Sequence, residues 1–80
     1  MKEIKLSDGR TIKMRKPKVR DIRIAHEQGK NEVEVEMILI GNLTGNTFDE
    51  VDDMDYDVYL PLQESLKGFL SSTGKKREKE

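Results

Sequence analysis

The sequence predicts an α+β fold in which an N-terminal β-hairpin packs on a small bundle of three helices. Residues 2–15 contain two alternating apolar and polar runs around an Asp-Gly pair, which is a strong signal for a hairpin. After Pro17, apolar residues recur every three or four positions, the spacing of amphipathic helices. A chain of 80 residues has room for one domain. We assign that domain to residues 1–70 and a disordered charged tail to residues 71–80.

The two strands are expected over residues 2–6 and 11–15. Because side chains alternate between the faces of a strand, one face should carry Ile4, Leu6, Ile12 and Met14. A two-stranded hairpin is unstable alone in water, so this face must pack on the helices. Pro17 ends the second strand, since proline cannot donate a hydrogen bond to a neighbouring strand.

The first two helices are expected over residues 18–28 and 32–44. Gly29 is a plausible end for the first helix, and Asn31 a plausible N-cap for the second. The alternation at positions 33–36 also fits a strand. A helix is favoured because the apolar stretch that begins there continues through position 43.

An acidic linker over residues 46–54, with a short helical turn around Asp49–Asp52, should precede the last helix. That helix is expected to begin near Asp55 or Asp57, because an amphipathic stripe follows: Tyr59, Leu62, Leu66, Phe69 and Leu70. Pro61 is unfavourable in a helix interior and tolerable in a first turn.

The composition argues against enzymes, metal sites and membrane spans. The chain has no cysteine and one histidine, so a zinc site is not expected, and no cofactor is predicted. Asp53, Asp55, Asp57 and Glu64 match four positions of a calcium loop, but Val58 replaces the glycine that such a loop needs. No apolar run approaches the roughly 20 residues of a membrane span, and the N-terminus lacks the apolar region of a signal peptide.

Charge is distributed unevenly along the chain. Residues 1–30 carry ten Lys/Arg and four Asp/Glu, a net +6, whereas residues 31–60 carry no Lys/Arg and nine Asp/Glu, a net −9. One interpretation is that the basic and acidic parts complement each other within the fold. The other is a dipolar surface that attracts a charged partner.

The order of these parts resembles the tail assembly chaperones of contractile-tailed phages, of the Mu and related type. The resemblance rests on Ile4-Lys5-Leu6-Ser7-Asp8-Gly9, Met14-Arg15-Lys16-Pro17, Val19-Arg20-Asp21-Ile22, Leu43-Thr44-Gly45, the acidic segment from Val51 to Asp57, and Gly68-Phe69-Leu70. It covers roughly residues 4–70. Two departures from the family pattern are Asn46 after Leu-Thr-Gly and Pro61 in the last helix.

This resemblance implies a non-enzymatic phage or prophage protein in the cytoplasm of the bacterial host. Such proteins are thought to coat the tape-measure protein and to recruit tail-tube subunits during virion assembly. The family often makes a longer version by ribosomal frameshifting, and a tail from Ser71 would suit that junction.

Independently of the family, exposed apolar helix surface would bind amphipathic helices of a partner. The candidate apolar residues are Val35, Leu39, Leu43, Tyr56 and Tyr59, with an acidic rim of Asp49, Asp52, Asp53, Asp55 and Asp57. A small apolar core and this surplus of apolar helix surface also make self-association plausible.

The leading alternative is a nucleic-acid-binding protein with a basic face, and a generic protein-interaction adaptor is a further one. Basic residues cluster over the hairpin and first helix: Arg10, Lys13, Arg15, Lys16, Lys18, Arg20 and Arg23. Such a stripe suits phosphate contacts. Against this, no aromatic side chain is interleaved with it for base stacking, and the acidic segment that follows would repel phosphate.

Overall fold

A computed structural model describes the backbone of residues 2–79 and the side chains of residues 2–70. It begins with the predicted hairpin, in which β1 (Lys2–Lys5) pairs antiparallel with β2 (Thr11–Met14) and Ile4 lies opposite Ile12. Gly9 takes a φ of 93° in the turn, a conformation that glycine adopts without steric cost. Ile4, Leu6 and Met14 are buried and Ile12 is partly buried, so the predicted apolar face is confirmed.

The first two helices lie where the sequence predicts them. α1 spans Val19–Gln28 and α2 spans Glu32–Thr44. The Asn31 side chain accepts a hydrogen bond from the backbone N–H of Glu34 at 2.9 Å, which satisfies one of the free donors at the start of α2. At the other end, Gly45 takes a φ of 79° in the left-handed cap.

The described residues form four helices, where the sequence analysis expected three. The additional helix, α3 (Phe48–Asp52), lies inside the predicted acidic linker. Its first turn is held by a reciprocal cap: the Thr47 hydroxyl accepts from the Glu50 backbone N–H at 3.1 Å, and the Glu50 carboxylate accepts from the Thr47 N–H at 2.8 Å. The buried Val51 anchors this helix.

The last helix, α4, spans Tyr56–Lys79. Its first hydrogen bonds run from the Val58 and Tyr59 N–H groups to the Asp55 carbonyl, at 3.0 and 3.1 Å. Pro61 therefore lies beyond the first turn, inside the helix. The sequence analysis assigned residues 71–80 to a disordered tail, whereas the backbone continues as helix through residue 79. The domain boundary at residue 70 stays a prediction.

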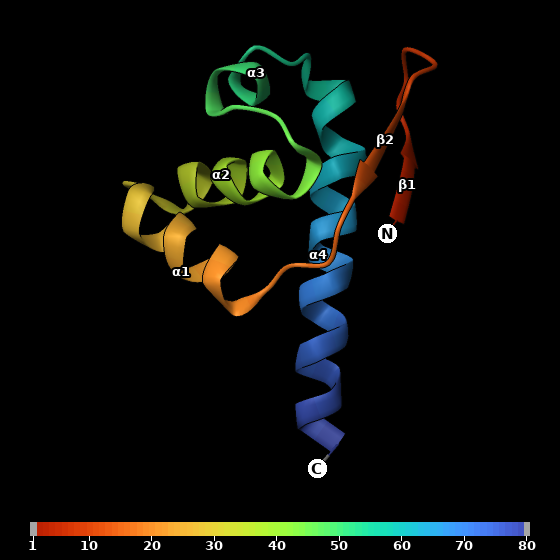
Figure 1. The fold of residues 1–80 in the computed structure, drawn as a ribbon. Helices are drawn as coiled ribbons and strands as arrows, with labels where there is room; N and C mark the ends of the chain where they lie inside the picture. The colour runs from red at the N-terminus through yellow and green to blue at the C-terminus, as the bar shows by residue number, and fades with distance from the viewer. Residues whose placement is uncertain (1, 80) are drawn as a thin grey trace.

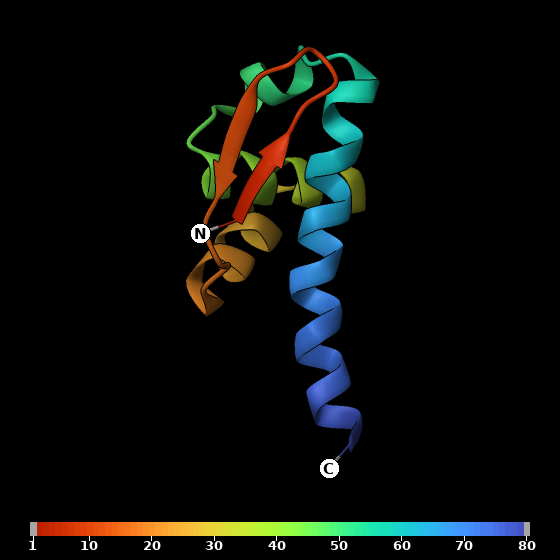
Figure 2. The same cartoon turned by 90° about the vertical axis from the view of Figure 1, so that its right-hand side faces the viewer.

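The hairpin covers the two longer helices (Figures 1 and 2). β2 lies against α2 and β1 against α4, while α1 and α3 both contact α2. Between these layers lies one apolar core, which comprises Ile4, Leu6, Met14, Ala25, Leu39, Ile40, Leu43, Val58, Leu62 and Leu66. Across residues 2–79, no helix combines the length and apolar character that crossing a bilayer requires.

Candidate functional site

An apolar groove of about 220 Å³ opens among the helices. Its walls come from α2, from α3 with the turn that follows it, and from the start of α4. The lining residues are Val33, Met37, Val51, Asp52, Met54, Tyr56 and Tyr59. Pockets for small molecules usually measure about 300–1,000 Å³. This groove is smaller, and suits the anchoring side chains of a larger partner.

The groove exists because α2 carries apolar side chains around most of its circumference. Leu39, Ile40 and Leu43 are buried in the core. Val33 and Met37 project from another side of the helix, and Val33 is 65% exposed. A helix that is apolar on all sides needs cover on all sides, and this small domain covers only part of α2.

Tyr56, in the first turn of α4, forms the opposite wall of the groove. Its side chain is 68% exposed although it is large and aromatic. Met37 and Met54 are partly buried between the two walls. Methionine side chains are flexible and polarizable, so they adapt to differently shaped partners.

A polar cluster lies beside Tyr59. Its hydroxyl donates to Glu36 Oε1 at 2.6 Å, and the Gln63 side-chain amide donates to the same oxygen at 3.0 Å. Burial, together with the neighbouring Glu36 carboxylate, raises the pKa of Tyr59 above its ordinary value near 10. The neutral phenol therefore remains a donor and holds the Glu36 carboxylate in place.

The acidic side chains around the groove have no basic partners in the described part of the chain. Its three ion pairs, Arg10–Asp8, Arg15–Asp21 and Arg23–Glu27, all lie within the basic segment. The interpretation that the basic and acidic segments complement each other within the fold therefore lacks ion pairs to support it. Seven of the nine acidic residues of this segment are exposed to solvent.

The predicted partner-binding residues divide into three groups. Tyr56, Tyr59 and Asp52 line the groove. Leu39 and Leu43 are buried in the core, and Val35 packs partly buried against it, so these three do not belong to the exposed surface. The remaining acidic residues, Asp49, Asp53, Asp55 and Asp57, are exposed on α3, the α3–α4 turn and the start of α4.

Sequence reasoning missed four lining residues: Val33, Met37, Val51 and Met54. The first two stood in the sequence as part of one broad apolar face of the second helix. The signal that could have found them is the width of this apolar face. One neighbouring helix or strand is too narrow to cover all of it, so some of its residues must stay exposed.

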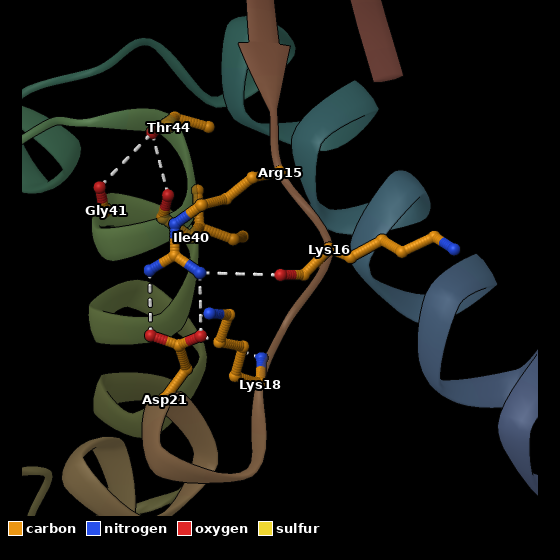
Figure 3. A network of polar contacts seen from close by, with 7 residues as sticks. All are labelled: Arg15, Lys16, Lys18, Asp21, Ile40, Gly41 and Thr44. Carbon is orange, nitrogen blue, oxygen red and sulfur yellow. Dashed lines mark hydrogen bonds and ion pairs between the residues drawn. The ribbon is translucent and has the colours of Figure 1, made fainter. Parts of the chain in front are cut away.

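A second polar network holds the hairpin to the helices (Figure 3). Arg15 Nη1 and Nη2 each donate to one carboxylate oxygen of Asp21 at 2.8 Å, and the Lys18 backbone N–H donates to Asp21 Oδ2 at 2.8 Å. The Arg15 backbone N–H reaches the Leu43 carbonyl at 3.1 Å. The guanidinium beside Asp21 lowers the pKa of that carboxyl to about 2. This network places the strand that precedes α1 against the end of α2.

The basic stripe is partly neutralised in the structure. Arg10, Arg15 and Arg23 form the three ion pairs, whereas Lys13, Lys16, Lys18 and Arg20 have no ion pair with any residue that the structure describes. A weaker basic face remains on the hairpin and α1.

A family model described as phage tail assembly chaperone proteins, E, or 41 or 14, matches residues 3–71. The chain belongs to this family. The match includes the hairpin, the Arg15–Asp21 network and every residue that lines the groove, and it confirms the resemblance found in the sequence. No curated protein and no solved structure matches the chain. The groove is therefore a surface of a phage tail assembly chaperone, and the family description names an assembly role rather than a catalytic one.

Proposed function

We propose that this tail assembly chaperone binds the tape-measure protein through the groove between α2, α3 and α4, and helps to recruit tail-tube subunits. The site of action would be the cytoplasm of the bacterial host, where tails are assembled. The role is one of binding, with no reaction catalysed.

The exposed apolar groove is the observation that carries this proposal. Val33 and Tyr56 are largely exposed on the lining of one hollow, and contiguous exposed apolar surface often marks a protein–protein interaction site. An apolar groove between helices is a common receptor for an amphipathic helix, whose apolar face it covers. Such binding would keep the apolar helices of an unassembled tape-measure protein apart until the tail tube surrounds it.

Co-expression with the tape-measure protein encoded in the same genome tests the proposal. The chaperone should hold the tape-measure protein in solution and co-elute with it in size-exclusion chromatography, in several copies per tape-measure chain. If the tape-measure protein stays insoluble and no complex elutes, this binding role is wrong. Adding the tail-tube protein then tests whether it joins the complex.

Variants of exposed residues tie binding to the groove. A double variant, Val33→Ser with Tyr56→Ser, removes two apolar side chains that line the groove. Both side chains are largely exposed and contribute little to the core, so the fold should persist. Val19→Ser is the matched control, because Val19 is 87% exposed and lies on α1, outside the groove. Loss of the complex with the double variant, and its retention with the control, would support the groove. Equal loss or equal retention would contradict it.

A further inference from the structure

The charges around the groove restrict what can occupy it. The segment from 31 to 60 supplies every wall of the groove and contains nine Asp/Glu and no Lys/Arg. Asp52 lines the groove, and Glu36 of α2 is bonded to Tyr59, which lines it as well. Asp53 and Asp55 are exposed on either side of Met54 in the turn between α3 and α4. Charge complementarity makes such a surface attract a basic partner and repel an acidic one.

Glu36 adds a fixed acceptor beside the groove. Both of its hydrogen bonds, from Tyr59 and from Gln63, reach Oε1. Oε2 receives no hydrogen bond from any residue whose side chain the structure describes, and no Lys or Arg among those residues pairs with this carboxylate. The carboxylate is therefore held in one orientation with one oxygen available. Its position in α2 is directly before Met37, which lines the groove.

We propose that the groove takes an amphipathic helix whose apolar stripe is bordered by lysine or arginine, one of which pairs with Glu36. The apolar stripe contacts Val33, Met37 and Tyr56, and the basic borders face the acidic rim. This inference rests on the proposed function and narrows it: among the helices of the tape-measure protein, the basic amphipathic ones are those bound.

A second copy of this chain fits the groove less well. Its helix α1 balances Arg20 and Arg23 with Asp21 and Glu27, so it offers no basic border. Its apolar stripe is also already used inside its own fold, where Ala25 is buried and Ile22 packs on the core. Val19 alone stands out at the start of that helix. A groove whose walls lie on three elements requires several apolar anchors on one face of the bound helix. A helix of another protein can supply them, whereas α1 of a second copy cannot.

Two synthetic helical peptides test the inference against the full chain. Both carry the same leucine stripe, bordered in one by lysine and in the other by glutamate. Fluorescence anisotropy gives the affinities, and amide chemical shifts of the labelled chaperone locate the bound peptide. The lysine peptide should bind at least tenfold more tightly at low salt, with shifts at the groove, and lose most of that preference at high salt.

Glu36→Gln should weaken binding of the lysine peptide at least threefold, because the amide still accepts from Tyr59 but carries no charge. Glu64→Gln is the matched control: it removes one charge from an exposed position of α4 outside the groove, and should leave the affinity unchanged. Equal losses with both variants would overturn the role of Glu36.

The remaining outcomes of the peptide experiment also test the inference. Equal affinity for the two peptides, no binding of either, or shifts centred on α1 would overturn the inference. So would groove shifts that grow with chaperone concentration alone, which would identify a second copy as the occupant. If the peptides fail to bind while the tape-measure protein still co-elutes, the proposed function stands and this inference is wrong. If the lysine peptide binds at the groove while the tape-measure protein does not co-elute, the groove binds basic helices and the proposed function is wrong.

Discussion

Arg15 and Asp21 form a two-pronged ion pair that joins the end of the hairpin to the start of α1. Two N–H···O bonds of 2.8 Å lie between the guanidinium and the carboxylate, and Asp21 is only 4% exposed. The backbone of the same arginine bonds to Leu43 at the end of α2. One residue thus fixes the position of the hairpin relative to both helices, and through α2 it fixes one wall of the groove.

Removing the carboxylate should destabilise the fold. Asp21→Ala deletes two charge-assisted hydrogen bonds and leaves the Lys18 N–H without its acceptor. Since the Arg15 side chain is 39% exposed and can turn to water, we expect a loss of roughly 2–3 kcal/mol in the free energy of unfolding. Urea denaturation measures it. Asp8→Ala, which breaks the exposed pair with Arg10, should change stability little, and equal losses would refute the distinction.

Acid should weaken the same contact. The pKa of Asp21 is lowered to about 2 in the folded chain from 3.8. A carboxyl with a depressed folded pKa contributes its stability above its unfolded pKa and loses it as pH falls through the folded value. The difference in unfolding free energy between the wild type and Asp21→Asn should stay constant from pH 7 to about pH 4, and shrink from there toward pH 2. A constant difference over the whole range would show that the charge of Asp21 contributes nothing.

Elements with a periodic apolar pattern were predictable from the sequence. The hairpin and the first two helices follow from alternation, from helical spacing and from caps such as Asn31. α3 was predicted only as a short helical turn around Asp49–Asp52 and not counted as a helix, because five residues are too few to show a period. Its existence depends on the reciprocal cap between Thr47 and Glu50, a local signal that the acidic composition of the segment obscured.

The groove was only partly predictable, for a physical reason. Sequence patterns show which side chains are apolar, but which of them remain uncovered depends on how far neighbouring elements reach. Leu39 and Val33 look alike in sequence, yet one is buried in the core and the other is exposed. Tyr56 and Tyr59, named from the sequence as candidate partner-binding residues, line the groove, and their role in binding stays a prediction.

Two helical glycines should respond in opposite directions to the same substitution. A Cβ at Gly41 would lie 2.7 Å from the Asn46 carbonyl oxygen, whereas a Cβ at Gly68 would meet nothing within 4 Å. Alanine favours a helix over glycine by about 1 kcal/mol. Gly68→Ala should therefore raise the free energy of unfolding by about 0.5–1 kcal/mol. Gly41→Ala should lower the free energy of unfolding despite that preference, because the backbone at Asn46 must move to make room for the methyl group. Thermal and urea denaturation compare the two, and a gain at Gly41 would show that the turn relaxes easily.

Pro61 should be a weak point of α4. It lies past the first turn, so it removes one backbone hydrogen bond and crowds the preceding turn. Pro61→Ala restores the N–H, while it also increases the entropy of the unfolded chain. We expect a net gain of about 1 kcal/mol in the free energy of unfolding, measured by urea denaturation. A loss would indicate that the partly buried ring, which lies beside β1, contributes more by packing than it costs in hydrogen bonding.

High pH should loosen the groove through Tyr59. Burial and the adjacent Glu36 carboxylate raise the pKa of this phenol above 10. The unfolded chain ionises its tyrosines near pH 10, so the stability that Tyr59 contributes is complete below pH 10 and is lost as pH rises beyond it. In Tyr56→Phe, which leaves one tyrosine, absorbance at the phenolate band should appear above pH 10 and together with unfolding. Tyr59→Phe should lose the bond to Glu36, at a cost of about 1–2 kcal/mol, and should show a flatter decline of stability above pH 10. Phenolate appearing near pH 10 in the folded Tyr56→Phe variant would mean that Glu36 and Tyr59 do not interact as described.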